Sequence, residues 1–309
     1  MINRNLTRAV ITGPTGVIGS ALCQELVKNG TEVYAVCRPG SKRMSVLPRH
    51  EKLKIVECAL EALSNLPGLI PGGADAFYHF GWSHTAGTGR NDMRAQIQNI
   101  QYTLDAVAAA YALGCRVFLG AGSQAEYGRF EGLLKAETPC FPENGYGMAK
   151  LCAGQMSRAE CQKLGMEHVW VRILSIYGPG DGVGTMISSV IGKLLVGEKP
   201  ALTAGEQQWD YLFSEDAALA FRLLAEHGVD GKTYVLGNGT AQPLRKYVEI
   251  LRDAIDPALP LGFGEVPYGS KQVMYLQADI SELTRDTGFA PRISFAEGIE
   301  KTINQFKEG

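Results

Sequence analysis

Tyr146 and Lys150 are the two side chains of this sequence whose types and spacing most directly predict proton-transfer chemistry. They stand four residues apart in "GYGMAK", and no other of the 12 tyrosines has a lysine four residues on. In a helix this spacing puts both side chains on one face. An ammonium group beside a phenol favours the phenolate and lowers a pKa that starts at about 10. Tyr146 is therefore a candidate proton donor or acceptor near neutral pH.

A third candidate, Ser123, stands in "GAGSQAEYG", after the apolar run "CRVFLG" and 23 residues before Tyr146. If the apolar run is a buried parallel strand, Ser123 lies at the carboxyl edge of the sheet, where folds of this kind bind ligands. The alternative is a serine that caps a helix or a turn.

The stretch "TGPTGVIGS" predicts a phosphate-binding turn. Gly13, Gly16 and Gly19 have the spacing GxxGxxG, follow the first predicted strand and open the first predicted helix. Glycines permit the tight turn, the close approach of the backbone to a pyrophosphate and the close packing of helix on sheet. An ordinary tight connection between strand and helix is the alternative. The same turn supplies three further candidate cofactor residues, Thr15, Val17 and Ile18.

The end of the second predicted strand bears on which dinucleotide is bound. An acidic residue about 20 residues after the glycines would bind the ribose 2′-hydroxyl of NAD, but this chain has Cys37 there. Arg38, Ser41, Lys42 and Arg43 follow it. Without a carboxylate to repel it, a 2′-phosphate is expected to bind these cations and the serine hydroxyl. NADP(H) is therefore the preferred cofactor, with NAD(H) as the second choice. A solvated basic loop is the alternative.

Strands and helices alternate along the part of the chain that must position these residues. Six short apolar runs predict buried parallel strands, at 8–12, 32–37, 52–58, 75–80, 115–120 and 167–173. Helical patterns between them include 19–30 and 94–114. This alternation predicts an α/β fold with a doubly wound parallel sheet of the Rossmann type.

After residue 172 the chain is rich in glycine and proline, which predicts a smaller, irregular C-terminal substrate lobe. Helical patterns occur there near 185–197, 214–227, 243–254 and 295–306. We expect the dinucleotide-binding Rossmann domain to comprise 1–172 plus about 212–240. The substrate-binding lobe would comprise about 173–211 plus 241–309.

Composition excludes several classes of protein. The 309 residues are 45% hydrophobic and carry a formal net charge of −2, which indicates no nucleic-acid-binding surface. No stretch approaches the roughly 18–20 apolar residues of a membrane-spanning helix. Seven scattered cysteines predict reduced thiols in a cytoplasmic protein. The five histidines form no metal-binding motif, so no protein-bound metal is expected.

Several of these motifs together resemble those of the extended short-chain dehydrogenases/reductases of the nucleotide-sugar epimerase/dehydratase type. Besides "GSQAEYG" and "YGMAK", the resemblance is carried by "TGPTGVIG", "YHFGW", "VRILSIYGPGD", "QQWDYLFSEDAALA" and "QADISELTRDTGFAPRISFAEGI", and it covers nearly the whole chain. It implies that Ser123 holds the reacting carbonyl beside Tyr146. It also implies that Lys150 binds the nicotinamide ribose and that Asn99 supports the active site. Further cofactor contacts are implied for Ala59, Leu60, Phe80, Gly81 and Trp82.

The resemblance also implies a substrate site, formed by Ser83, Ser123, Gln124, Glu126, Ser175 and Trp209. Glu126 is expected to line the sugar site or its rim, with a surface acid as the alternative. Ser175 stands where the family has an asparagine, Trp209 where it has an arginine and Ala59 where it has an aspartate. Trp209 has no charge to offer a phosphate, although its ring can stack on a base or a sugar.

The function implied is an NAD(P)-dependent oxidoreductase that acts on a nucleotide-linked sugar. Its reaction would be reduction of a 4-keto-6-deoxysugar nucleotide by hydride transfer from NADPH. A nucleotide-sugar 4-epimerase that retains NAD is the first alternative, and a non-catalytic dinucleotide-binding protein is the second. Dehydration is disfavoured, because the family's dehydratases have an Asp-Glu pair where this chain has Gln124 and Ala125.

The partners expected are a small nucleotide-sugar substrate and a second copy of the chain, without nucleic acid or membrane. The resemblance implies that a homodimer forms through the helix near 91–113 and the helix that carries Tyr146. Apolar residues at 108–110 and 113 fit this interface, and they fit an internal contact between helix and sheet equally well.

Overall fold

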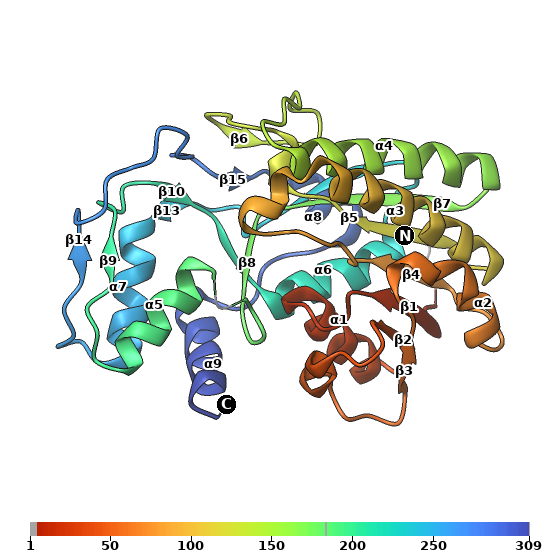
Figure 1. The fold of residues 1–309 in the computed structure, drawn as a ribbon, viewed down its shortest axis with the longest axis horizontal. Coiled ribbons are helices and arrows are strands. Elements are labelled where there is room, and N and C mark those ends of the chain that lie inside the picture. Colours follow the sequence, from red (N-terminus) through yellow and green to blue (C-terminus); the bar gives the residue numbers. More distant parts are fainter. Residues whose placement is uncertain (1–4, 183, 309) are drawn as a thin grey trace.

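A parallel sheet of seven strands forms the centre of the protein (Figure 1). The structure is a computed structural model that describes residues 5–182 and 184–308. The strand order is β12-β7-β5-β4-β1-β2-β3, and every neighbouring pair is parallel. The strands are β1 (Arg8–Thr12), β2 (Glu32–Cys37), β3 (Leu53–Glu57), β4 (Ala76–His79), β5 (Val117–Ala121), β7 (Glu167–Ile173) and β12 (Thr233–Leu236).

The doubly wound α/β fold and all six strands expected from the sequence are confirmed. The seventh strand, β12, was not predicted. It has only four residues and lies far along the chain, between a helix and a glycine-rich stretch. Its place in the sheet is set by pairing with β7, which a pattern of local apolar residues does not reveal. The division into two domains stays a prediction, and β12 is the point at which the chain returns to the large sheet.

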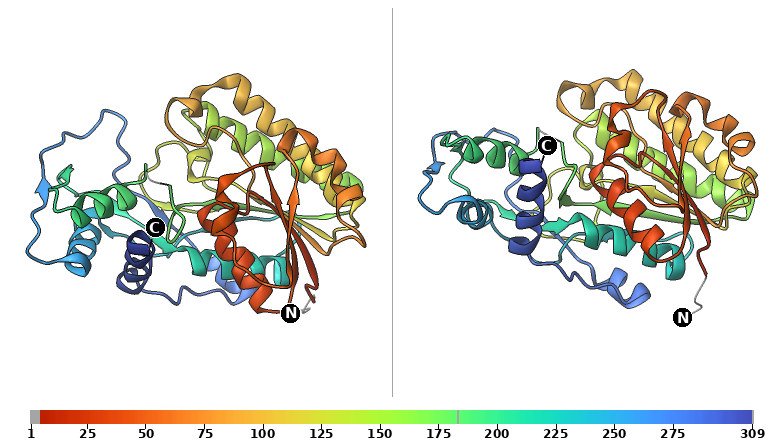
Figure 2. Two further views of the ribbon diagram at one scale, coloured as in Figure 1. Left: turned by 60° about the horizontal axis from the view of Figure 1, so that its bottom comes forward. Right: turned by 90° about the horizontal axis from the view of Figure 1, so that it is seen from below.

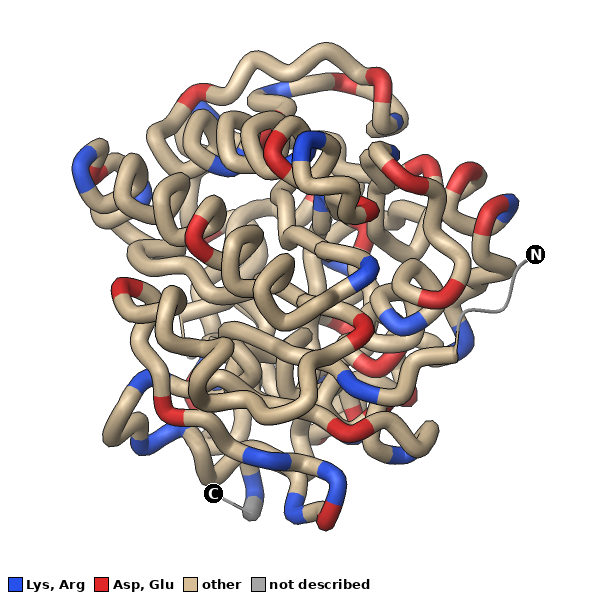
Figure 3. Tube along the Cα trace, turned by 90° about the vertical axis from the view of Figure 1, so that its right-hand side faces the viewer, with Lys and Arg blue, Asp and Glu red and all other residues tan. Residues whose placement is uncertain are grey.

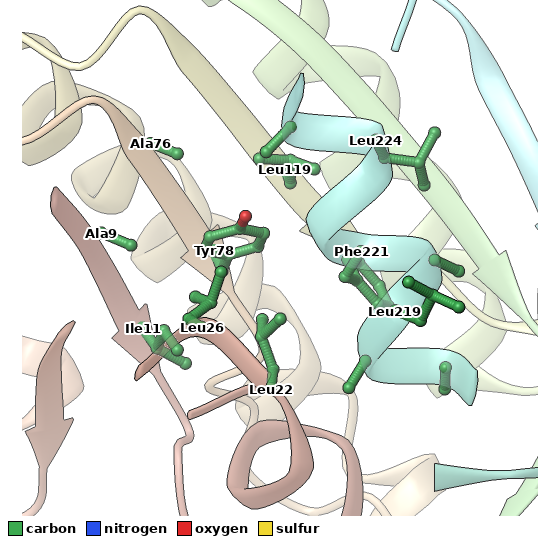
Figure 4. Packing of buried hydrophobic residues seen from close by; sticks show 14 of the residues in the cluster. Ala9, Ile11, Leu22, Leu26, Ala76, Tyr78, Leu119, Leu219, Phe221 and Leu224 are labelled. Atoms are coloured by element: carbon green, nitrogen blue, oxygen red, sulfur yellow. The ribbon is translucent and has the colours of Figure 1, made fainter. Parts of the chain in front are cut away.

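Helices cover both faces of the sheet (Figures 1 and 2). One face carries α1 (Val17–Lys28) and α6 (Ser214–His227), and the other carries α2 (Leu66–Leu69), α3 (Met93–Ala112) and α4 (Gly145–Leu164). Neighbouring residues of β1 enter different cores: Ala9 and Ile11 pack on the α1 side, where Leu22 and Phe221 also lie (Figure 4), and Val10 packs on the α3 side. Because side chains alternate along a strand and both faces are buried, the strands are apolar at consecutive positions.

A smaller region of short two-stranded sheets lies beside the large sheet, at the left and along the upper middle of Figure 1. Its pairs are β8 (Ser175–Tyr177) with β11 (Tyr211–Phe213), β10 (Gln208–Trp209) with β13 (Gln242–Pro243), β9 (Ala201–Leu202) with β14 (Gly262–Phe263), and β6 (Leu133–Leu134) with β15 (Gln277–Ala278). Its helices include α5 (Met186–Leu195), α7 (Leu244–Ile255) and α9 (Phe295–Glu308), all three predicted, while α8 (Ser281–Thr287) lies beside α6. A separate apolar core holds Tyr177, Ile191, Phe213, Leu251 and Ile299.

Charged residues of both signs are interspersed over the face seen in Figure 3. Within residues 5–182 and 184–308, no helix combines the length and the apolar character needed to span a membrane. The same part of the chain contains no group of three or more His, Cys, Asp or Glu side chains arranged to hold a metal ion.

Candidate active site

Two adjoining cavities open at the carboxyl ends of β1, β2, β4 and β5. The Tyr146 cavity, of about 330 Å³, is lined by Gly16, Val17, Ile18, Gly19, Phe80, Ser123, Tyr146 and Lys150, among others. The Arg38 cavity, of about 430 Å³, is lined by Thr15, Arg38, Ser41, Arg43, Ala59, Leu60, Gly81 and Ser83, among others. Gly13 and Trp82 belong to both cavities, so the two form one cleft. The residues that we predicted for the cofactor therefore line this cleft, except Lys42, which is exposed and is not among the lining residues of either cavity.

The glycine-rich turn is shaped by close backbone contacts that need glycine. Gly13 has a φ of +68°, and a Cβ atom on it would lie 2.8 Å from the carbonyl carbon of Phe80. A Cβ atom on Gly19 would lie 2.4 Å from the carbonyl oxygen of Gly13. Gly16 caps α1 without a side-chain hydrogen bond, so the first N–H groups of this 12-residue helix have no side-chain cap where they meet the cleft. Such a helix start suits a pyrophosphate group. The cleft therefore fits a dinucleotide.

At the other end of the cleft, two arginines are held differently. Arg38 is exposed on the loop after β2. The guanidinium of Arg43 donates hydrogen bonds to the carbonyl oxygens of Thr15, at 2.9 Å, and Gly180, at 3.0 Å. Arg43 thus links the glycine-rich turn to the loop after β8. A guanidinium has five N–H donors, so this link leaves donors for a ligand.

The three predicted proton-transfer residues come together in the Tyr146 cavity. Asn144 caps α4 and accepts a hydrogen bond from the Gly147 amide at 2.8 Å, which puts Tyr146 in the first turn of the helix. Ser123 and Tyr146 both line this cavity. Nζ of Lys150 donates to the carbonyl oxygen of Ala121 at 2.6 Å and lies 5.8 Å from the centre of the Tyr146 ring.

Burial dominates the electrostatics of this cavity. Burial raises the pKa of Tyr146, and the hydrogen bond from Ser123 and the charge of Arg90 oppose this rise. Burial also lowers the pKa of Lys150 to about 7, against the attraction of the Glu126 carboxylate. Both pKa shifts have the same cause, because burial removes water and so disfavours the charged form of each side chain. At neutral pH, Lys150 in this structure is therefore close to losing its proton.

Glu126 corrects the sequence interpretation, because it neither lines the cleft nor lies on the surface. Its side chain is 0% exposed. Its carboxylate accepts hydrogen bonds from the Ser123 amide at 2.8 Å, Nε1 of Trp170 at 3.0 Å and Nε of Arg172 at 2.8 Å. A buried carboxylate needs such partners. Glu126 therefore lies beneath the serine loop and holds it.

The two interpretations of Ser123 prove compatible. Its Oγ accepts a hydrogen bond from the Ala125 amide at 3.1 Å, which caps the short 3₁₀ helix η4 (Gln124–Glu126). The same residue lines the Tyr146 cavity, and its role toward a substrate carbonyl stays a prediction. Gln124 is half-buried at the start of η4.

Asn99 supports the site from below rather than lining it. It is 1% exposed, and its Oδ1 accepts from the Ser83 amide at 2.9 Å while its Nδ2 donates to the Ser83 carbonyl at 3.0 Å. This clamp fixes the loop that carries Trp82, whose ring centre lies 3.7 Å from Nζ of Lys150.

Two residues of this loop system were missed from the sequence. Gln96 accepts a hydrogen bond from Nε1 of Trp82 at 3.0 Å and donates to the carbonyl oxygens of His84 and Gly89. Arg90 lies over the ring of Tyr146. The available signal for Gln96 was its place three residues before Asn99 on the inward face of a helix. Arg90 gave no signal, because only the path of the loop brings it to Tyr146.

Ser175 and Trp209, the two departures from the family pattern, contact each other. Nε1 of Trp209 donates to Oγ of Ser175 at 2.8 Å, and the Trp209 ring packs against an apolar cluster that includes Leu174. Neither is among the residues that line the Tyr146 or Arg38 cavity. Their predicted role in binding substrate stays a prediction.

Comparison with known proteins places the chain in a family. The model of the "NAD dependent epimerase/dehydratase family" matches residues 9–237. The chain belongs to this family. It is therefore an enzyme whose cofactor is a nicotinamide dinucleotide.

The relatives described below are distant but cover nearly the whole chain. The chain is 24% identical to an uncharacterized UDP-glucose epimerase of Bacillus subtilis, with 96% of each chain covered. It is 22% identical to the CDP-abequose synthase of Salmonella muenchen, with 96% of this chain and 97% of the relative covered. Among solved structures, the UDP-N-acetylglucosamine 4-epimerase of Methanobrevibacter ruminantium M1 superposes with a TM-score of 0.88 at 22% identity, over 99% of each chain. At this identity the superposition speaks for the fold.

Proposed function

We propose that this enzyme reduces a keto group, at C4, of a nucleotide-linked 6-deoxysugar, with NADPH as the reductant. The observation that carries the choice of reductant is the polar end of the Arg38 cavity, where β2 ends in Cys37 and where Arg38, Ser41 and Arg43 line the wall. A 2′-phosphate finds cations and a hydroxyl there. The names of the relatives, a CDP-sugar synthase and several UDP-sugar epimerases, support a nucleotide-linked sugar as substrate.

In this proposal the chain's own residues bind the carbonyl and supply the proton. A bound NADPH would supply the hydride for the carbonyl carbon. Ser123 donates a hydrogen bond to the carbonyl oxygen, and Tyr146 gives that oxygen its proton, so that the ketone becomes a secondary alcohol and Tyr146 becomes a phenolate. Lys150, which lies beside Ala121 and Trp82, would hold the nicotinamide ribose. Each step uses a group that lines the Tyr146 cavity.

Purified protein incubated with a panel of 4-keto nucleotide sugars tests the proposal. We expect NADPH to be consumed with one of them, at a much lower rate with NADH, and an alcohol product to appear in equal amount. Consumption of neither reductant with any 4-keto sugar, by protein that binds the cofactor, would contradict the reductase.

A 4-epimerase that retains NAD is the second candidate, and the contacts of Arg43 favour it. Arg43 bridges Thr15 and Gly180 across the edge of the cleft, which suits a cofactor that stays bound. Solved relatives include UDP-glucuronic acid 4-epimerase of Bacillus cereus in complex with NAD. Two measurements on purified protein would establish this alternative. The folded protein should interconvert 4-epimers without added cofactor, and the same preparation should release NAD when it is denatured.

We propose a homodimer through the outer faces of α3 and α4. Met93 and Ile97 on α3 and Met148 and Met156 on α4 are exposed, with 65% of Ile97 accessible. Burial of such apolar side chains stabilises an association. Sedimentation at micromolar concentration should give twice the 33.4 kDa mass of one chain, and Ile97→Arg should give the single chain. A single chain in the unmutated protein would reject the dimer.

Two further expectations complete the proposal. All seven cysteines are unpaired, which is compatible with the cytoplasmic location expected from the sequence. The stacking role expected for Trp209 requires a face of its ring to be reachable by a substrate, because Nε1 of the indole already donates to Ser175.

A further inference from the structure

Arg90 occupies a position that the proposed chemistry does not yet use. It lies in the 3₁₀ helix η3 (Gly87–Asn91), on the loop that follows β4, and its Cζ atom is 4.3 Å from the centre of the Tyr146 ring. The rings of Trp82 and Tyr146 meet in a T-shaped arrangement, with centres 6.1 Å apart and planes at 81°. Arg90 is half-buried. A cation at this distance over an aromatic face is attracted by the ring itself and by any negative charge on it.

The loop is anchored on both sides of Arg90. Gln96, only 2% exposed, donates to the carbonyl oxygens of His84 at 3.0 Å and Gly89 at 3.1 Å. Oδ1 of Asn91 accepts from the amide of Gly145, the residue before Tyr146, at 3.1 Å. These contacts hold Arg90 against the start of α4 and not elsewhere on the surface.

The absence of a side chain at Gly145 favours this close approach. A Cβ atom at this position would lie 2.7 Å from Sδ of Met93 and 3.1 Å from the carbonyl oxygen of Arg90. The Met93 side chain is flexible and can move away, but the carbonyl oxygen of Arg90 would be closer than most real Cβ contacts, and Gly145 itself is buried. The close packing of the Arg90 loop on α4 is therefore built into the backbone at the residue adjacent to Tyr146.

The charged and polar groups that face Tyr146 differ in whether their charge changes near neutral pH. Lys150, from its own helix, is buried on Ala121 and Trp82, and burial lowers its pKa to about 7. Glu126, from η4, is negative and acts against a phenolate, while Ser123 stabilises it by a hydrogen bond. Arg90 makes no ion pair among the residues that the structure describes, and arginine keeps its charge at every pH at which proteins work. Of the two cationic side chains, Lys150 and Arg90, only Arg90 therefore keeps a constant charge around neutral pH.

We infer that Arg90 is a positioning residue that stabilises the phenolate left on Tyr146 after proton transfer. The inference deepens the proposed function and rests on it, since it concerns the same tyrosine. The cation with a constant charge is then Arg90, in the loop after β4. The sequence pattern had indicated Lys150, one turn after Tyr146 in the same helix, as the cation that acts on the phenol. With a neutral side chain at position 90, the Tyr146 phenolate would be stabilised by Ser123 and by Lys150, whose charge varies near neutral pH.

The test follows the ionisation of Tyr146 directly. Full-length protein carrying tyrosine labelled with ¹³C at the phenol carbon is titrated by NMR, and Tyr146→Phe identifies the signal. In Arg90→Met the midpoint for Tyr146 should move to higher pH, and Arg90→Lys should restore part of the shift. Turnover at neutral pH should fall about tenfold in Arg90→Met, the scale of a partly desolvated cation–π contact.

Arg94→Met is the matched control, because Arg94 is exposed on the first turn of α3 and should leave the midpoint unchanged. Arg90→Gln serves as a second neutral variant if the methionine variant does not fold. An unchanged midpoint of the Tyr146 titration in the neutral variant overturns the inference. This holds even if turnover falls, because Arg90 would then only hold the loop in place. Retained turnover in Tyr146→Phe refutes the proposed function instead, so the two failures are distinguishable.

Discussion

The two ends of the cleft hold their polar groups in opposite ways. At the Tyr146 end, Ser123, Tyr146 and Lys150 are packed against a buried layer of Glu126, Gln96 and Asn99, in which nearly every polar atom has a partner. At the Arg38 end, the cations stand on an exposed loop after β2. Buried groups are tuned by desolvation and by fixed neighbours, while exposed charges act through a field that solvent and salt weaken.

This difference separates chemistry from recognition. The Tyr146 end must hold a proton donor in place to within a fraction of an ångström, and buried hydrogen bonds supply that order. The Arg38 end has only to distinguish a phosphate from a hydroxyl, for which exposed arginines suffice. Changes at the first end should therefore affect turnover and stability, and changes at the second should affect affinity and its dependence on salt.

The largest effect is expected at Tyr146. Tyr146→Phe removes the proton donor but keeps the ring between Arg90 and Trp82, so turnover should fall about 10²–10⁴-fold while cofactor affinity stays the same. Steady-state kinetics and a cofactor titration measure the two quantities. Tyr111→Phe, at an exposed tyrosine of α3, is the matched control. Near-normal turnover in Tyr146→Phe would remove this residue from the mechanism.

The next effect concerns stability at the same end. Glu126→Ala leaves the buried guanidinium of Arg172 without its carboxylate and should lower the free energy of unfolding by about 3–5 kcal/mol. It also frees the Ser123 amide and removes the negative charge that holds the Lys150 pKa up, so turnover should fall even where the protein is folded. Denaturant unfolding gives the stability change.

Two variants sharpen this test. Glu126→Gln keeps one acceptor oxygen, which can still accept from the Ser123 amide and from Nε1 of Trp170, so it should lose less stability than Glu126→Ala. Glu137→Ala, at an exposed glutamate, should change little. Equal stability of the Glu126→Ala and Glu137→Ala variants would show that the buried carboxylate does not hold the serine loop.

How far the sequence predicted these two ends depends on how local the signals are. The glycine-rich turn, the Tyr146–Lys150 pair and the arginines after β2 are each set by neighbouring residues, and the structure brings all of them to one cleft. Glu126 was assigned to the sugar site or the surface, because a carboxylate in a polar loop gives no local sign of burial. Its partners, Trp170 and Arg172, lie on a strand more than 40 residues away.

The contacts of Arg90 and of the Trp209–Ser175 pair were beyond prediction for a similar reason. Arg90 reaches Tyr146 through the path of a loop and the missing side chain of Gly145. Trp209 and Ser175 meet because their strands lie in two neighbouring small sheets. Such contacts between distant segments are set by packing, and no periodic pattern in one segment encodes them.

Acid should lower the stability of the buried residues beneath the Tyr146 end before it affects the exposed Arg38 end. His168 lies beneath the cleft between Phe118 and Trp170, with Ser157 on its Nε2, and burial lowers its pKa to about 4. Because the pKa is lower in the folded than in the unfolded protein, stability is complete above about pH 6.5 and is lost as the pH falls toward 4. From pH 6.5 to 5 we expect a loss of about 2 kcal/mol from this residue.

Unfolding curves at several pH values measure this loss. His168→Gln should make the pH dependence shallower, whereas His50→Gln, at an exposed histidine, should leave it as it is. The same pH dependence in the His168→Gln variant and in the unmutated protein would place the acid-sensitive group elsewhere.

The smallest effect, and the one that decides between reductase and epimerase, is expected at Arg38. One exposed guanidinium paired with a 2′-phosphate is a charge-assisted contact weakened by solvent, so NADPH should bind about tenfold more tightly than NADH. Arg38→Ala should remove most of this preference, and added salt should reduce it in the unmutated protein but not in the variant. Arg49→Ala, at an exposed arginine that does not line the Arg38 cavity, is the control. Calorimetric titration with both cofactors measures all of these affinities. Because the contact is at the recognition end, turnover at saturating NADPH should be unchanged in Arg38→Ala. Equal affinities in the unmutated protein, or NAD that stays bound through dialysis, would move the epimerase to first place and would make Arg43, rather than Arg38, the residue that matters at this end.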